Sequence, residues 1–241
     1  MKQHEAVILT LEKLGGQATL GQLYQEVLKI EGCEWKTKTP FNSIRKIVQI
    51  RPEIFKVQPG LWALKSYKQK LGLQEFTEKS KEKKDLEKTH AYFQGLLTHI
   101  GNYRKFETYI PNQDKNKLFV DTRLGNIRSL QELPSYSYPE TVKRSSTIDV
   151  IWINDRKMPH SFFEIEHNTD MQNSLLKFSD MQDFNSRMII VADEHRHQEF
   201  DSKVKMKAFR EISTRVKFLG YSSLVRQYEE EVFKSTQSFI L

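Results

Sequence analysis

The chain has 241 residues, of which 38% are hydrophobic and 11% aromatic, so it can form one large or two modest folded domains and is not a disordered protein. Its formal net charge of +7 suits a polyanionic partner such as nucleic acid. No segment approaches the ~20 apolar residues of a membrane span, and the first residues hold too short an apolar run for a signal peptide. Cys33 is the only cysteine, which excludes an internal disulfide and favours a cytoplasmic location.

Residues 1–65 predict three helices followed by a short hairpin. The signals are an apolar helix stripe that stops at Gly15-Gly16, the capping-box spacing of Thr19 and Gln22, and the helix start Thr39-Pro40. Pro59-Gly60 then places a tight turn between two short apolar strands. Three helices and a two-stranded wing make a winged helix-turn-helix, so we expect this domain first.

Three sequence segments of this region resemble the HARE-HTH family. The similar segments are residues 21–24, 39–45 and 55–64. That family occurs in chromatin proteins, in a bacterial polymerase subunit and fused to restriction nucleases. The resemblance implies that the third helix contacts DNA, with the candidate residues Thr39, Asn42, Ser43, Arg45 and Lys46. Two alternatives stay open, namely that this helix only packs against the domain or that the domain binds protein.

Residues 66–88 are dense in mixed charge and predict a solvated linker, which leaves 89–241 as a second domain. Its first predicted elements are a helix from 85 or 89 to about 100, a strand at 106–110 and a polar irregular stretch at 112–145. Two strands at 146–153 and 161–167 follow, then a helix from Thr169 to about 184 and a strand at 187–192. The last elements are a loop with His195 and His197, a further helix, a strand at 216–219 and a helix from 222.

Three acidic residues stand in the two apolar strands at the centre of this domain. Asp149 lies in the first strand, and Glu164 and Glu166 point to one face of the second because strand side chains alternate. A turn-rich connection joins the strands, so we expect a hairpin that brings Asp149 beside the glutamates. Carboxylates among apolar residues need compensation, and a hard cation such as Mg²⁺ provides it. The alternative is a hairpin whose acids face water.

This acid and Glu-x-Glu order, with the flanking residues 148–152 and 163–181, resembles the PD-(D/E)XK nuclease superfamily over roughly residues 86–230. The resemblance implies an α+β domain with an αβββαβ core and a mixed sheet. It implies Mg²⁺ ligands at Asp149, Glu164, the carbonyl of Ile165 and Glu166. Glu166 takes the place usual for a lysine, so it would accept a proton or bind metal, and Lys177 is the candidate for the missing cation. Gln94, one turn after His90 on the first helix, is a further candidate catalytic residue.

The combined reading is an Mg²⁺-dependent, site-specific, double-stranded DNA endonuclease of the restriction type, aided by the winged helix. A homodimer is one open assembly state, and a methyltransferase is expected as a genomic neighbour. Two alternatives stay open: a non-catalytic winged-helix regulator with a degenerate nuclease fold, and a nuclease that depends on DNA modification.

Overall fold

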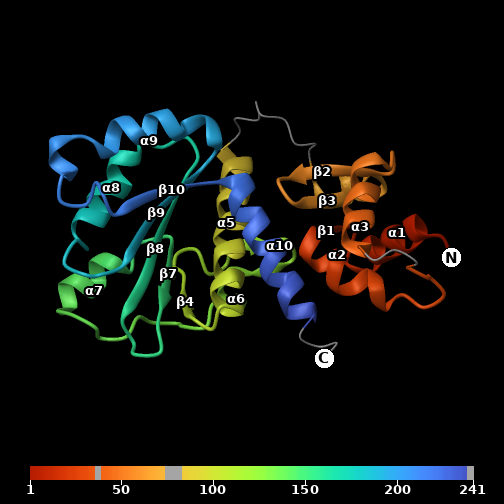
Figure 1. Ribbon diagram of the computed structural model, residues 1–241, viewed down its shortest axis with the longest axis horizontal. Coiled ribbons are helices and arrows are strands. Elements are labelled where there is room, and N and C mark those ends of the chain that lie inside the picture. The colour runs from red at the N-terminus through yellow and green to blue at the C-terminus, as the bar shows by residue number, and fades with distance from the viewer. Residues whose placement is uncertain (36–38, 74–82, 238–241) are drawn as a thin grey trace. The chain divides into compact units, whose positions relative to one another are not determined.

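The computed structural model describes residues 1–35, 39–73 and 83–237. Contacts divide the chain into two units, and in Figure 1 the smaller one is coloured red to orange apart from the blue end of α10, while the larger one runs from yellow to blue. The smaller unit comprises Met1–Lys81 and Tyr228–Leu241, and the larger comprises Glu82–Gln227. The centre of the expected linker therefore lies outside the described residues. None of the described helices is both long and apolar enough to cross a membrane.

The smaller unit holds helices around a three-stranded antiparallel sheet. Its elements are α1 (Gln3–Lys13), β1 (Gln17–Thr19), α2 (Leu20–Glu26), α3 (Pro40–Ile50), β2 (Ile54–Gln58), β3 (Leu61–Leu64) and α4 (Lys68–Leu71). The strands lie in the order β1-β3-β2, so the predicted hairpin is confirmed and β1 is an addition to it. The capping box is also confirmed, because Gln22 N donates to Thr19 Oγ1 over 3.1 Å and Thr19 N donates to Gln22 Oε1 over 2.8 Å.

Helix α10 (Tyr221–Gln237) is divided between the two units, which differs from the expected domain boundaries. Val232 is fully buried, and Tyr228 Oη lies 3.4 Å from Thr19 Oγ1. A Cβ at Gly21 would lie only 2.8 Å from Tyr228 Cε1, so glycine permits this close packing on α2. The part of α10 from Tyr228 onward therefore completes the core of the smaller unit, because its side chains Tyr228 and Val232 are buried there.

The larger unit is built on a five-stranded sheet in the order β10-β9-β8-β7-β4. Its elements are α5 (Lys83–Tyr103), β4 (Glu107–Tyr109), β5 (Leu118–Phe119), β6 (Thr122–Arg123), α6 (Leu124–Ile127), α7 (Pro139–Ser145), β7 (Val150–Ile153), β8 (Pro159–Glu166), α8 (Met171–Ser179), β9 (Arg187–Ala192), α9 (His197–Val204) and β10 (Val216–Gly220). β8, β9 and β10 run parallel, whereas β4 and β7 pair antiparallel, so the predicted α+β class with a mixed sheet is confirmed.

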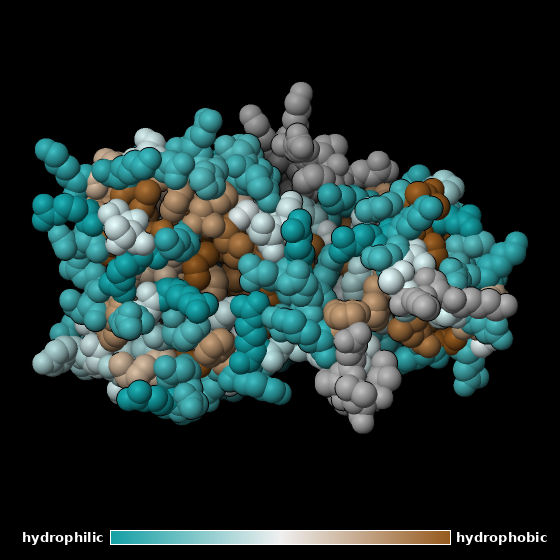
Figure 2. All heavy atoms as spheres, in the orientation of Figure 1, coloured by the Kyte–Doolittle hydropathy of each residue, from teal (hydrophilic) through white to brown (hydrophobic). Residues whose placement is uncertain are grey.

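The core of the larger unit lies on both faces of this sheet. Phe162 and Ile190 face one side, where they belong to a buried cluster with Phe178 of α8. On the other side Trp152 Nε1 donates to Leu97 O of α5 over 3.1 Å. Figure 2 shows a hydrophobic patch on the larger unit framed by hydrophilic side chains. Packed side chains therefore support β7 and β8 from both faces of the sheet.

Several predicted boundaries in this unit were wrong. The stretch 112–145 contains β5, β6, α6 and α7, which are too short to produce a periodic sequence signal. Helix α8 is capped by Asp170, whose side chain accepts from Gln172 N over 3.0 Å, rather than by Thr169, and it ends at Ser179. His195 lies in a 3₁₀ turn and His197 begins α9, so neither is in an irregular loop.

Candidate functional site

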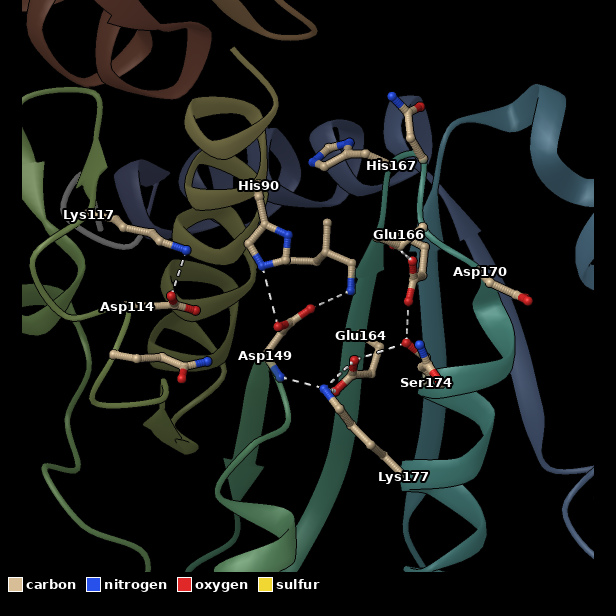
Figure 3. A pocket seen from close by; sticks show the side chains of 15 residues that line it. His90, Asp114, Lys117, Asp149, Glu164, Glu166, His167, Asp170, Ser174 and Lys177 are labelled. Atoms are coloured by element: carbon tan, nitrogen blue, oxygen red, sulfur yellow. Dashed lines mark hydrogen bonds and ion pairs between the residues drawn. The ribbon is translucent and has the colours of Figure 1, made fainter. Parts of the chain in front are cut away.

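A cleft of about 530 Å³ opens in the larger unit where β8 ends and β7 begins (Figure 3). Helix α5, helix α8 and the segment between β4 and β5 supply its other walls. Its lining includes His90, Asp114, Lys117, Asp149, Glu164, Ile165, Glu166, His167, Thr169, Asp170, Ser174 and Lys177. The cleft therefore collects ionisable side chains from elements that are far apart in the sequence.

The predicted pairing of Asp149 with Glu164 is present. Val150 pairs with Phe163 in the hairpin register, so Asp149, the residue before β7, lies beside the end of β8. Asp149 N donates to Glu164 Oε1 over 3.3 Å, and Ile165 N donates to Asp149 Oδ2 over 2.8 Å. Both carboxylates are held by the backbone of the opposite strand, which fixes them on one side of the cleft.

The two carboxyl groups differ in their acidity. Burial, together with the charge of Asp149, raises the pKa of Glu164 to about 8. Burial alone would also raise the pKa of Asp149, but the His90 imidazole and the Ile165 N–H hold that pKa below its usual range. The cleft therefore presents an ionised Asp149 next to Glu164, whose raised pKa keeps it protonated to higher pH unless a cation compensates its charge.

Lys177 provides a positive charge from α8. Its Nζ lies 2.9 Å from both carboxylate oxygens of Glu164 and donates to Thr147 O over 2.9 Å. The Lys177 side chain is 22% exposed and the Glu164 side chain 4%. The structure thus brings Lys177, which the sequence singled out as a candidate, to the acidic residues of the cleft.

Glu166 is held by hydroxyl groups. Thr169 Oγ1 donates to one of its oxygens and Ser174 Oγ to the other, and the Ser174 hydroxyl also lies 3.0 Å from Glu164 Oε2. Because a hydroxyl carries a single proton, Ser174 cannot donate fully to both glutamates. Burial raises the pKa of Glu166 as well, despite these donors. Ser174 and Thr169 were not among the predicted site residues, since serine and threonine near a helix start ordinarily indicate capping.

A second group of ligand atoms lies on the other wall of the cleft. His90 Nε2 is 3.3 Å from Asp149 Oδ1, and one ligand atom each of His90, Asp114 and Asp149 lies within 4.8 Å of the others. Gln94 is fully buried and donates to Asp114 Oδ2 over 2.9 Å and to Asp149 O over 3.1 Å, so it positions this wall. Asp114 was not predicted, because its segment has no periodic pattern. The available sequence signal for this wall was the shared helix face of His90 and Gln94.

His167 lies on the cleft wall next to Tyr221. The Tyr221 hydroxyl hydrogen-bonds to His167 Nδ1, and the imidazole centroid is 5.9 Å from that of His90. Burial lowers the pKa of His167 to about 3. His167 is therefore a neutral side chain that packs against the site.

The five candidate DNA-binding residues lie at the start and along α3 of the smaller unit. Thr39, Asn42 and Lys46 are exposed, and Ser43 is half-buried. Arg45 donates to the carboxylate of Glu229 on α10 and, over 3.4 Å, to Tyr24 Oη. The structure thus leaves Asn42 and Lys46 open to a partner and engages Arg45 within the unit.

The family comparison covers the site and the whole of the larger unit. Residues 71–240 match the family model described as the type II restriction enzyme NmeDI C-terminal domain. Neither the curated proteins nor the solved structures gave a significant match. The match spans more than half of the 241 residues and includes both walls of the cleft. The chain therefore belongs to the family of the NmeDI C-terminal domain, a family of restriction-type endonucleases.

Proposed function

We propose that the chain is an Mg²⁺-dependent endonuclease that cuts double-stranded DNA at a specific site, with catalytic residues in the cleft of the larger unit. The observation that carries this proposal is the convergence of Asp149, Glu164 and Lys177 from three elements on one cleft (Figure 3). DNA is a polyanion, and the net charge of +7 favours its approach.

The donor set fits a hard divalent cation. The side chains of Asp149 and Glu164 are 15% and 4% exposed, and their oxygens face the same cleft as Glu166. Such buried carboxylates require a compensating charge, and oxygen ligands are those that Mg²⁺ prefers. Asp149 and Glu164 would hold the ion, with the Ile165 carbonyl and Glu166 as further candidates. When bound, Mg²⁺ polarises a phosphoryl oxygen and favours the ionised form of a bound water.

The chain's own residues supply the remaining chemistry. Glu166, with its pKa raised by burial and its oxygens held by Ser174 and Thr169, is suited to accept a proton from the attacking water. Lys177 pairs with Glu164, and its ammonium would offset negative charge that develops on the phosphate. Gln94 acts indirectly by holding Asp114 and the backbone of Asp149.

The smaller unit would serve as a winged helix that binds the same duplex. Its three helices precede the β2–β3 hairpin, and α3 displays Asn42 and Lys46 to solvent. Asparagine reads adenine edges, and lysine contacts guanine or phosphate in the major groove. We further propose that the protein acts in the cytoplasm, as a homodimer on a duplex site, with the protecting methyltransferase encoded nearby.

The test of this function is incubation of the full chain with supercoiled plasmid in Mg²⁺ and in EDTA, using methylated and unmethylated DNA in parallel. The proposal expects defined fragments in Mg²⁺ and intact plasmid in EDTA. Binding without cleavage in every cation would instead identify a DNA-binding regulator. Cleavage of methylated DNA alone would identify a nuclease that depends on modification.

A further inference from the structure

A second set of metal ligands faces the cleft across Asp149 from Glu164. We infer that His90, Asp114 and Asp149 bind a second divalent cation, of a class that accepts imidazole nitrogen, such as Mn²⁺, Co²⁺ or Zn²⁺. This inference deepens the proposed nuclease function and rests on it for the cation's role in cleavage, although binding itself depends only on the three side chains.

The geometry of the three side chains supports a shared ligand. His90 Nε2 lies 3.3 Å from Asp149 Oδ1, and one ligand atom from each residue lies within 4.8 Å of the other two. Ligand atoms bound at ~2.0–2.2 Å from one ion can be no farther apart than about 4.4 Å, so a small approach of these groups suffices. His90 comes from α5, Asp114 from the loop after β4, and Asp149 from the start of β7.

The surrounding contacts hold these ligands in place. Gln94, which has no exposed surface, donates to Asp114 Oδ2, and Ile165 N donates to Asp149 Oδ2. Asp149 Oδ1 is thereby left facing His90. Such partners of metal ligands orient them and tune their affinity. Gln94 Oε1 is itself buried without a hydrogen-bond partner among the described residues, which marks this wall as polar and incompletely satisfied.

Lys117 supplies a positive charge beside Asp114, and a bound cation would replace that charge. Its Nζ lies 2.6 Å from Asp114 Oδ1, and its side chain is 36% exposed, whereas that of Asp114 is 6% exposed. The lysine can therefore turn toward solvent when an ion binds, while Asp114 stays in place. The corresponding ligand in the first site, Glu164, likewise pairs with a lysine, Lys177, that is more exposed than the acid.

The imidazole ligand of His90 determines which class of metal ion the site prefers. Mg²⁺ and Ca²⁺ bind oxygen ligands, whereas imidazole suits Mn²⁺, Co²⁺ and Zn²⁺ increasingly well. Asp149 with Glu164 offers oxygen only, so the two sites differ in preference although they share one carboxylate. Three protein ligands leave coordination positions for water or a phosphate oxygen, as in catalytic rather than structural metal sites.

The test is pulsed electron paramagnetic resonance of Mn²⁺ bound to the full chain without DNA, because coupling to ¹⁴N reports imidazole ligation directly. The variants are His90→Gln, Asp114→Asn and Glu164→Gln. His197→Gln is the matched control, since His197 Nδ1 also lies 3.3 Å from an aspartate oxygen, that of Asp201. Free Mn²⁺ measured in the same samples gives the affinity.

We expect ¹⁴N coupling in the parent chain, in His197→Gln and in Glu164→Gln, and its loss in His90→Gln. Asp114→Asn should weaken Mn²⁺ binding at this site by at least ~10-fold. Absence of ¹⁴N coupling in the parent, or coupling that persists in His90→Gln, overturns the inference. A parent chain that shows the coupling but cuts no DNA refutes the nuclease function alone, and one that cuts in Mg²⁺ without the coupling refutes the second site alone.

Discussion

Lys177 Nζ lies 2.9 Å from both carboxylate oxygens of Glu164. The lysine comes from the second turn of α8, and the glutamate comes from β8, two residues before Glu166. The positive charge is therefore supplied from a neighbouring helix, and Glu166 is left available for another role. This arrangement leads to the first two predictions.

Lys177→Met should lower kcat for DNA cleavage by about 10²–10³-fold, which is the usual effect of removing one group that stabilises developing charge. DNA affinity should change little, because a single phosphate contact is lost. Single-turnover cleavage and filter binding measure the two effects. Lys157→Met is the control, since Lys157 also pairs with a glutamate, at 2.6 Å from Glu107, but outside the cleft. Equal activity of both variants would remove Lys177 from the mechanism.

Glu166→Lys, which produces the commoner pattern of the PD-(D/E)XK nucleases that the sequence resembles, should be inactive or badly impaired. The substitution places a second ammonium in a site that already contains Lys177 and removes the acceptor for the Ser174 and Thr169 hydroxyls. Glu166→Gln distinguishes the effect of the negative charge from that of side-chain shape, because glutamine keeps a hydrogen-bond acceptor but cannot act as a base. Cleavage rates of the two variants over a range of pH provide the measurement. Near-parental activity of Glu166→Lys would show that position 166 needs no negative charge.

The metal-free chain should become less stable as pH rises between about 4.5 and about 8, through Glu164. The folded-state pKa of about 8 lies above the ordinary value of 4.5, so the native state binds more protons than the unfolded state in this window. The free energy of unfolding therefore falls with increasing pH. Glu164→Gln should flatten that dependence.

Urea unfolding in EDTA, followed by Trp152 fluorescence with Trp35 and Trp62 replaced by phenylalanine, isolates the larger unit. Metal should reverse the trend, because an ion that binds ionised Glu164 stabilises the native state more as pH rises. A parent chain whose metal-free stability rises with pH, or a Glu164→Gln variant with the same slope, would contradict the assignment.

In the smaller unit, Lys46 and Arg45 should respond differently to substitution. Lys46 is exposed, so Lys46→Ala should weaken DNA binding for all sequences and reduce the salt slope by about 1. Arg45 is engaged by Glu229, so Arg45→Ala should mainly destabilise the unit, by about 1 kcal/mol because the pair is partly exposed. Affinity at several salt concentrations and thermal unfolding separate the effects. A reduced salt slope for Arg45→Ala with unchanged stability would show that Arg45 contacts DNA.

The sequence predicted the elements that have strong local patterns. Apolar and aromatic alternation located β8, and a short, nearly all-apolar run located β9. The hairpin geometry placed Asp149 beside Glu164, because strand register follows from the turn. Asp114 could not be predicted, since its position depends on how the loop after β4 packs on α5. The burial of Val232 was also missed, because α10 is divided between units and a helix pattern does not reveal which core receives it.

The most direct test of the central claim compares plasmid cleavage and DNA binding in Asp149→Asn and Glu164→Gln. Both substitutions keep the shape of the side chain and remove the negative charge that would hold Mg²⁺. We predict that each variant binds the DNA site as tightly as the parent in Ca²⁺ but cuts it in Mg²⁺ at less than a few per cent of the parental rate. Cleavage by either variant at a rate near that of the parent would contradict the assignment of Asp149 and Glu164 as the catalytic metal ligands.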